Sequence, residues 1–487
     1  MSKRKSSTAV RTVAALMTVI IILGSGWWFR DDLKEMLNLT EKPEDALAEL
    51  LNDPFADKDI TLTVQTMLDL NFDPFKKPFI IRHPSVTINL LGLEMTTLYE
   101  PDKFKAYMEK SDQTIDLYML PLKQFTILAA EGKLKGLDAL FKKHDIDLDS
   151  YYPPLVDLIR LAGDGELYGF TAGYSSTALF VNRKLFEEHG IPLPEEGDSL
   201  DEILDTAARF KGTGVYGMAT GSGFTNRGLS QFTAFIGQSN GLKTLTLEKN
   251  RLTASLNSKS WKEVWQQVAD GYKDGWLGES PPINWNAGSV THNQIFAQEL
   301  FANGKTAMTI GDGAYYRDLS LYESREGGTS LDWITIPYEI DPAATNQSNY
   351  LGTGFVYAIN AKSQNAEAAW ELLRFIVGEE MAVKNDRITD NQPFDASLAA
   401  NPSSMKSLPE EKWRGFYGMK ADPAHVLSEI QVVSDKYYGI ARDEFFKLSK
   451  EQLNAVIDGS KTIDDALSDL QAKLDEYLLN YGERGAG

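Results

Sequence analysis

The chain has 487 residues, no cysteine and a formal net charge of −20 at pH 7. The missing cysteines exclude disulfides, thiol nucleophiles and cysteine-bound metals, and the acidic balance argues against nucleic-acid binding, which requires clustered cations. The length predicts two or more domains, and a hydrophobic content of 43% indicates globular packing.

The N-terminus combines a basic flank with an apolar run over residues 13–29. Because basic flanks stay in the cytoplasm, we expect everything after Arg30 to lie outside the cell. The run is near the short limit for a membrane span. Residues 1–30 are therefore interpreted as an uncleaved signal anchor or, alternatively, as a signal peptide cleaved after Gly26. Residues 31–55 follow as a charged spacer with some helix.

The first strands are predicted at residues 60–64 and 86–90, with Pro74 and Pro78 in a loop between them. Another strand is predicted to end within residues 115–121. Ligands gather at the carboxyl ends of strands in open α/β sheets, which draws attention to Asp116 and Tyr118.

Residues 164–191 predict a passage from one α/β unit to another. A turn at Asp164 leads into a short strand over residues 166–170, and a small, polar stretch follows over residues 171–176. Residues 177–182 form a second apolar strand. A helix over residues 183–189 ends at Gly190, which supplies the left-handed conformation favoured at helix ends.

Two motifs resemble a nucleotide-binding and a calcium-binding sequence, but their sequence context argues against both functions. Gly212, Gly214 and Gly217 match the spacing of a dinucleotide fingerprint, but they follow a helix, opened by a capping box at Ser199, and lead into a strand over residues 215–219. The acidic stretch 145–149 lacks the glycine and terminal glutamate of a calcium loop, so it is interpreted as a solvated linker.

Later elements complete an alternating α/β pattern. Helices are predicted at residues 229–236, 261–270, 290–301 and 366–377, and a final helix follows a second capping box at Thr462. Strands are predicted at residues 304–310, 333–337 and 355–359.

These motifs closely resemble the extracellular solute-binding proteins of ABC importers, the group that contains maltose-binding protein. The first crossing of that family matches at Asp164, Gly165, Tyr168, Gly169, Phe180, Asn182, Leu185, Phe186, Gly190, Ile191 and Pro192, with Val181 where the family usually has Tyr. Further matches are the strand ending in Ala307-Met308 and the helix around Trp370. The resemblance covers residues 60–481. The lipidated cysteine of many relatives is absent, because Gly26 stands at its position.

The resemblance implies an α/β, two-lobed periplasmic-binding-protein-like fold of type II, in which each lobe is a mixed sheet flanked by helices. Lobe one is expected to comprise residues 56–171 plus 354–409, and lobe two residues 172–353 plus 410–487. The crossings are expected near Ala172, Gly352 and residues 410–413. A monomer tethered by its N-terminal helix, closing around a solute and delivering it to an ABC permease, is the implied function.

The expected ligand is a sugar or oligosaccharide, since aromatic faces stack on sugars and the chain has 20 Tyr and 9 Trp. Candidate ligand-binding residues are Asp116, Tyr118, Tyr174, Ser175, Ser176, Trp285, Asp312, Tyr315, Tyr316, Tyr437 and Tyr438. Tyr315 or Tyr316 is expected to stack, with Asp312 and Asp116 accepting from hydroxyls. Core packing is the alternative for each tyrosine.

No catalytic, metal or cofactor residues are predicted. The sequence has no zinc-protease, phosphate-loop or serine-hydrolase motif, and its five histidines are scattered singly. The alternatives are a membrane-tethered sensor for a receptor kinase, a scaffold, and a carbohydrate-active enzyme that uses a carboxylate pair.

Overall fold

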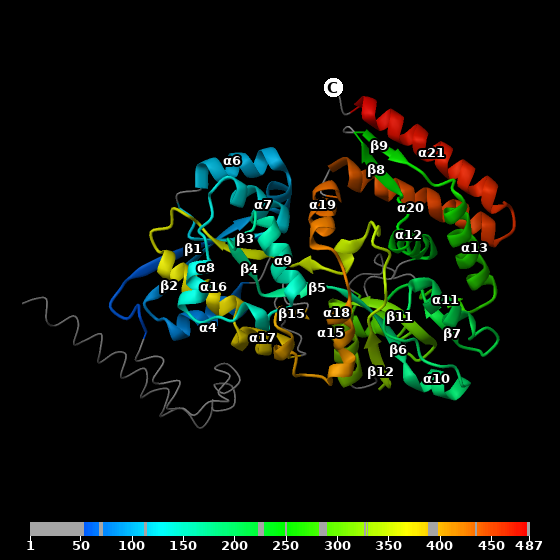
Figure 1. Cartoon of the computed structure of the whole chain (residues 1–487), viewed down its shortest axis with the longest axis horizontal. Helices are drawn as coiled ribbons and strands as arrows, with labels where there is room; N and C mark the ends of the chain where they lie inside the picture. The colour runs from blue at the N-terminus through cyan, green and yellow to red at the C-terminus, as the bar shows by residue number, and fades with distance from the viewer. Residues whose placement is uncertain are drawn as a thin grey trace, which may run out of the picture. The chain divides into compact units, whose positions relative to one another are not determined.

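The structure is a computed structural model of the whole chain (Figure 1). It describes residues 53–67, 72–111, 114–222, 228–248, 251–281, 290–325, 328, 330–387, 398–433 and 436–484. The predicted membrane segment, most of the predicted spacer and Trp285 lie outside these residues. Within the described ranges, no helix is long and apolar enough to cross a membrane.

The described residues divide into two compact units, residues 53–62 with 72–89 and residues 63–67 with those from 90 onward. In the first unit, helix α4 (Asp73–Arg82) buries Phe75 and Phe79. The ring of His83 lies 4.6 Å from that of Phe79, and its Nδ1 lies 2.8 Å from Asp53 Oδ1. The prediction of a loop around Pro74 and Pro78 is wrong, because both prolines lie within α4. Pro74 is in the first turn, where a missing N–H is tolerated, and the buried phenylalanines outweigh the hydrogen bond lost at Pro78.

The first large sheet has the strand order β2-β1-β3-β14-β4. Its strands are β1 (Ile60–Met67), β2 (Val86–Leu93), β3 (Leu117–Leu120), β4 (Gly169–Thr171) and β14 (Val356–Ile359). Strand β1 runs parallel to β3, whereas β14 is antiparallel to both β3 and β4. Helices α7 (Leu122–Ala130) and α16 (Ala366–Val377) pack against its strands.

The second large sheet has the order β10-β7-β11-β6-β12 and is also mixed. Its strands are β6 (Thr177–Asn182), β7 (Tyr216–Ala219), β10 (Leu277–Gly278), β11 (Thr306–Asp312) and β12 (Trp333–Ile336). Strand β11 is parallel to β7 and antiparallel to β6. The predicted α/β class with mixed sheets is therefore confirmed.

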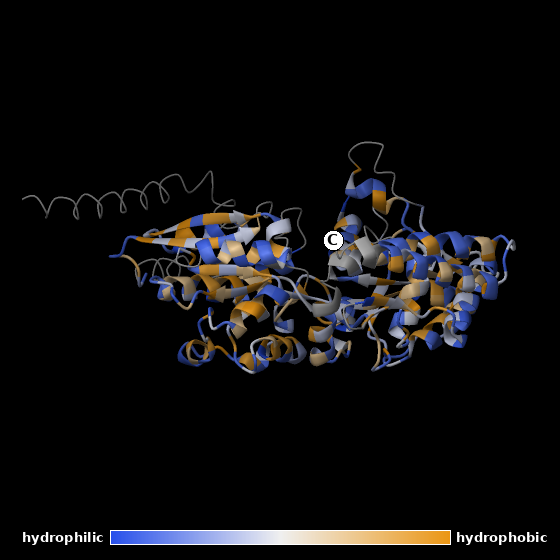
Figure 2. Cartoon of the chain, turned by 90° about the horizontal axis from the view of Figure 1, so that it is seen from above, coloured by the Kyte–Doolittle hydropathy of each residue, from blue (hydrophilic) through white to orange (hydrophobic). Residues whose placement is uncertain are grey.

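The helices around this second sheet are amphipathic, and Figure 2 shows hydrophilic and hydrophobic residues alternating along them. Helix α11 (Leu200–Ala208) buries Leu200, Ile203 and Leu204, and its N-terminus has the predicted capping box between Ser199 and Glu202. The long helices α20 (Lys436–Ile457) and α21 (Ile463–Arg484) pack on each other and on α13 (Lys259–Lys273).

A small sheet of order β13-β5-β15 lies where the chain passes between elements of the large sheets. Strand β5 (Gly173–Ser175) follows β4 and precedes β6, and it pairs with β13 (Gly352–Thr353) and β15 (Leu398–Ala399). Residues 410–412, predicted as a crossing, form the short 3-10 helix η6 (Glu410–Lys412). The division of the chain into lobes stays a prediction.

The predicted helix over residues 290–301 is wrong in length, since α14 (His292–Phe296) has five residues. Beyond it, the Glu299 carboxylate accepts the N–H groups of Phe301 and Ala302, at 3.2 and 2.6 Å. These side-chain bonds replace the backbone bonds that would continue the helix.

Candidate functional site

A pocket of about 300 Å³, a volume that includes space open to solvent, lies within the second unit. Its apolar walls come from Ala172, Leu398 and Met405, and its polar lining includes Tyr316, Arg317, Asn385 and Asp386.

Separate segments of the chain bring the polar lining together. Tyr316 and Arg317 lie in α15 (Gly313–Ser324), whose cap residue Asp312 accepts the Tyr315 N–H at 2.8 Å. Asn385 and Asp386 end helix α17 (Glu379–Asp386). Ala172 joins β4 to β5, and Leu398 lies in β15. The pocket thus borders the small sheet through which the chain passes.

In the part of the chain that the structure describes, four polar atoms of the pocket lining are buried without a hydrogen-bond partner: Tyr316 Oη, Arg317 Nη1, Asn385 Nδ2 and Asp386 Oδ1. The exposed fractions of Tyr316, Asn385 and Asp386 are 1%, 8% and 7%. Buried polar atoms are normally paired, and each unpaired one costs about 1–3 kcal/mol. All four residues line the same pocket, which makes it the candidate site for a polar ligand.

The Asp386 carboxylate is hydrogen-bonded to the backbone just after the pocket residue Met405. Its Oδ2 accepts the N–H groups of Lys406 and Ser407, both at 2.6 Å. Charge-assisted bonds of this kind are strong, so they fix the carboxylate, and Oδ1 is its remaining acceptor.

Electrostatics favours the hydrogen-bonding states that a hydroxylated ligand needs. Burial, followed by the nearby Asp386 charge, raises the pKa of Tyr316 above its ordinary value, so its hydroxyl stays protonated. Burial lowers the pKa of Arg317, whereas Asp318 and Asp312 raise it. An arginine keeps its proton in proteins. The pocket therefore offers donors from Tyr316, Arg317 and Asn385, and an anionic acceptor from Asp386.

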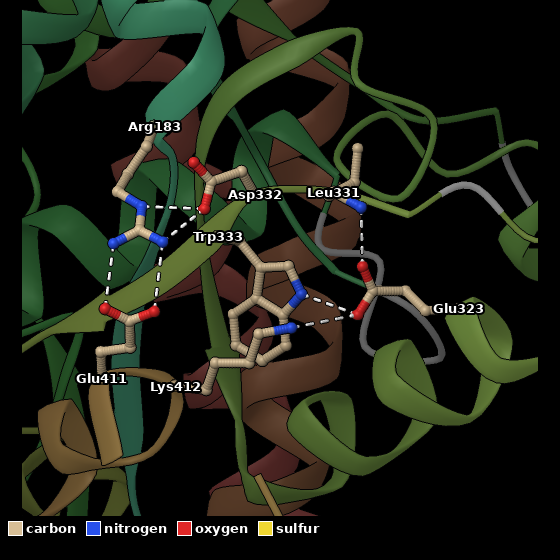
Figure 3. Close-up of polar contacts among 7 residues, drawn as sticks. All are labelled: Arg183, Glu323, Leu331, Asp332, Trp333, Glu411 and Lys412. Carbon is tan, nitrogen blue, oxygen red and sulfur yellow. Dashed lines mark hydrogen bonds and ion pairs between the residues drawn. The ribbon is translucent and has the colours of Figure 1, made fainter. Parts of the chain in front are cut away.

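The segment beyond Met405 is anchored at its far end by Arg183 (Figure 3). The guanidinium donates to both carboxylate oxygens of Glu411, at 2.9 and 3.1 Å, and to Asp332 Oδ1 at 2.9 Å. This two-pronged geometry matches the planar guanidinium to the carboxylate and connects η6 to the start of β12.

A second anchor holds Lys412 (Figure 3). Its Nζ lies 4.2 Å from the Trp333 ring centroid and 3.5 Å from Glu323 Oε2. Trp333 Nε1 donates to the same oxygen at 2.9 Å, and the Leu331 N–H donates to Glu323 Oε1 at 2.8 Å. The two anchors fix the segment that starts at the pocket wall against the second large sheet.

The predicted ligand residues Asp116 and Tyr118 are buried at or in the first large sheet, among other side chains of the protein. Asp116 is 6% exposed, and its oxygens accept from the Thr63 N–H at 2.9 Å and the Ser363 hydroxyl at 2.6 Å. Tyr118 is fully buried in β3, in register with Gln65. Neither lines the pocket.

The predicted residues Tyr174, Ser175 and Ser176 lie in or beside β5 and also outside the pocket lining. The Tyr174 ring is buried 5.0 Å from Tyr152 and 5.1 Å from Tyr417. Ser176 donates to the Phe416 carbonyl at 3.3 Å. Ser175 pairs with Gly352 in β13.

Of the two tyrosines predicted in the turn after β11, one lies in the core and the other lines the pocket. Tyr315 is 2% exposed, lies 5.0 Å from Phe180, and donates its hydroxyl to Glu299 Oε2 at 3.0 Å. Tyr316, its neighbour, lines the pocket, and Asp312 caps their helix. Tyr437 and Tyr438 lie in α20, where Tyr438 is 9% exposed.

Sequence reasoning missed Arg317, Asn385 and Asp386. Arg317 directly follows the predicted tyrosine pair, and an arginine beside a predicted site is a usable signal. No local sequence pattern distinguishes Asn385 and Asp386 from the end of any other short helix.

Comparison with known proteins gives a family match over most of the chain. The profile described as bacterial extracellular solute-binding protein matches residues 77–410. No curated protein sequence matches the chain.

Solved structures match almost over their full length. An extracellular solute-binding protein of family 1 from Alicyclobacillus acidocaldarius matches with a TM-score of 0.55 at 14% identity, covering 86% of this chain and 98% of that chain. A sugar transporter from Rhizobium etli in an open conformation matches with 0.52 at 17% identity, covering 85% and 99%. The sugar-binding protein MalE from Xanthomonas citri matches with 0.50 at 17% identity, covering 88% and 99%. At these identities the likeness shows the fold.

Proposed function

The chain belongs to the bacterial extracellular solute-binding proteins, and we propose that it captures a sugar or short oligosaccharide and delivers it to an ABC permease. Membership of this family implies an extracytoplasmic location. The observation that carries the ligand class is the set of four unpaired polar atoms around one pocket. A polyhydroxylated molecule supplies both donors and acceptors, so it satisfies all four at once. Two structural neighbours, a sugar transporter and a sugar-binding protein, support the same class.

Hinge closure is the proposed means of capture. In the small sheet β13-β5-β15, the short strands β5 and β13 lie in the connections between the large sheets, and the pocket borders the small sheet at Ala172 and Leu398. Short connections of this kind absorb the backbone changes of domain closure. Closure removes water from the bound solute and gives the permease a surface that differs from the ligand-free one.

Tethering through residues 13–29 is part of the proposal. The full-length chain is expected to stay with the membrane without lipid attachment, and a chain that begins near Asp57 is expected to be soluble. Sequencing the N-terminus of the mature protein tests this directly. A mature chain that begins at or near Trp27 would rule out the anchor.

The ligand proposal is tested by a thermal-shift screen of the full-length chain against sugars, oligosaccharides and peptides. A solute at 100 times its Kd stabilises the folded state by about 2.7 kcal/mol. We expect stabilisation by at least one sugar, and its loss in Asp386→Asn but not in Asp205→Asn on the exposed face of α11. Stabilisation by peptides alone, or equal binding by both variants, would contradict the proposal.

A further inference from the structure

Arg317 differs from the other arginines whose contacts the structure gives. Arg160 pairs with Asp138 at 2.8 Å, Arg183 with Glu411 at 2.9 Å, and Arg374 with Glu371 at 2.5 Å. Arg317 Nη1, in contrast, is buried against the pocket without a hydrogen-bond partner. A buried cationic donor without a partner is costly, and a ligand anion would offset that cost.

The acidic residues nearest to Arg317 in sequence are engaged elsewhere. Asp312 Oδ1 accepts the Tyr315 N–H at 2.8 Å, and Asp318 Oδ1 lies 3.6 Å from His292 Nε2. Their charges favour the charged guanidinium, but neither carboxylate hydrogen-bonds to Nη1. Nη1 is therefore a buried cationic donor that a ligand carboxylate would satisfy.

Asp386 sets a limit on the ligand's charge. Asp386 lines the same pocket as Tyr316 and Asn385, and its Oδ1 has no hydrogen-bond partner among the described residues, so this part of the lining favours hydroxyls and disfavours a second ligand anion. A neutral sugar would leave the guanidinium without an anion, and a dicarboxylate would bring two like charges together. The chain as a whole carries a charge of −20, so an anionic solute needs a local cation to bind.

We propose that the solute is an acidic sugar, a uronate or a short oligosaccharide with one uronate unit. Its carboxylate binds Arg317, and its hydroxyls bind Asp386, Asn385 and Tyr316. This inference rests on the proposed function and narrows its ligand class.

The test is calorimetric titration of the full-length chain, purified in a detergent without a sugar headgroup. The probes are D-glucuronate and D-galacturonate, their neutral parents D-glucose and D-galactose, digalacturonate, a digalacturonate with one unit esterified, and D-glucose 6-phosphate. A single uronate group is expected to strengthen binding at least about tenfold over the matched neutral sugar, as a charge-assisted bond does. The doubly charged digalacturonate should bind more weakly than its half-esterified form.

Arg317→Gln is expected to remove this preference, and Arg317→Lys, which keeps the charge without the fork, to retain part of it. Arg160→Gln, a surface arginine of α9 (Pro153–Ala162), is the matched control and should leave the preference intact. Melting temperatures without ligand check that each variant folds.

Equal or tighter binding of the neutral sugars, or an unchanged preference in a folded Arg317→Gln, overturns the acidic-sugar assignment while sugar capture stands. Tightest binding of the sugar phosphate likewise overturns it. Binding of none of these sugars, neutral or acidic, counts against the proposed sugar-binding function as well as this inference.

Discussion

Two neighbouring tyrosines at the start of α15 have opposite surroundings. The Tyr315 hydroxyl donates to Glu299, whereas the Tyr316 hydroxyl is buried beside the pocket without a partner. Tyr315→Phe should therefore cost about 1–2 kcal/mol of unfolding free energy without affecting solute affinity. Tyr316→Phe should leave the ligand-free stability unchanged or slightly raised, and should weaken solute binding. Chemical denaturation and titration of both variants test this pair, and the reverse pattern would exclude Tyr316 from the site.

The buried Glu299 predicts a specific pH dependence of stability. Burial raises the pKa of its carboxyl to about 7, against the opposing effect of the bonds from Ala302, Phe301 and Tyr315. A carboxyl whose pKa is raised on folding contributes stability below its ordinary pKa, and that contribution is lost as the pH rises through about 7. Between pH 5 and 8 the loss is roughly 2.5 kcal/mol.

Glu299→Gln should flatten this fall in stability, measured as unfolding free energy at each pH. Glu263→Gln, on the exposed surface of α13, is the matched control and should retain the wild-type slope. A parallel fall in wild type and Glu299→Gln would show that another group titrates.

Only some residues of the candidate site could be predicted from the sequence. Tyr316 could be predicted because it follows a strand whose motif is local. Asp386 could not, since its role depends on tertiary contacts with residues far away in the chain, and nothing around it in the sequence differs from an ordinary helix end.

At the scale of elements, Gly217 shows what the glycine motif after α11 does. A Cβ at Gly217 would lie 2.0 Å from the Ala207 carbonyl oxygen, so β7 approaches α11 too closely for a side chain. Gly212 and Gly214 have φ of 78° and 88°, as the turn between helix and strand requires. The glycines of this motif therefore serve the turn and the close helix–strand packing.

Gly217→Ala should destabilise the protein by about 1–3 kcal/mol or more, because overpacking forces the backbone apart. Gly136→Ala, where a Cβ would meet nothing within 4 Å, is the control and should change the unfolding free energy little. Equal melting temperatures for both variants would contradict the close approach.

The Lys412 anchor makes a second prediction at this scale. The side chains of Lys412 and Glu323 are 18% and 13% exposed, so their attraction is less screened than at the surface. Lys412→Gln should cost about 1–3 kcal/mol through the lost charge-assisted and cation–π contacts. Lys184→Gln, at an exposed ion pair with Glu188, should cost less than about 0.5 kcal/mol. A similar cost for both would show that the Lys412 contacts contribute little to stability.

Elements with strong local signals were predicted at their boundaries. Strand β6 and helix α10 (Arg183–His189) begin and end at the predicted residues, and Gly190 has a φ of 62°. Helix α4 was missed because its prolines suggest a loop, and the end of α14 was missed because Glu299 redirects the backbone. In both cases tertiary contacts override a local pattern.

At the scale of the whole molecule, the sequence predicts the family, whereas the residues that line the pocket come together only in the folded chain. The motifs of the family are spread from residue 60 to residue 481, so the fold could be predicted from many weak matches that agree. The pocket lining combines segments around residues 172, 316, 385 and 398–405, and its chemistry emerges only on folding. Structural neighbours at 14–17% identity share the fold and carry no residue-level information about the ligand.

The most direct test of the pocket as the solute site is a structure of the full-length chain with the tightest-binding sugar from the titrations. We predict a ligand hydroxyl at hydrogen-bond distance, about 2.7 Å, from Asp386 Oδ1, with Tyr316, Arg317 and Asn385 also bonded to the sugar. A sugar bound elsewhere, with these four polar atoms still unpaired, would contradict the account.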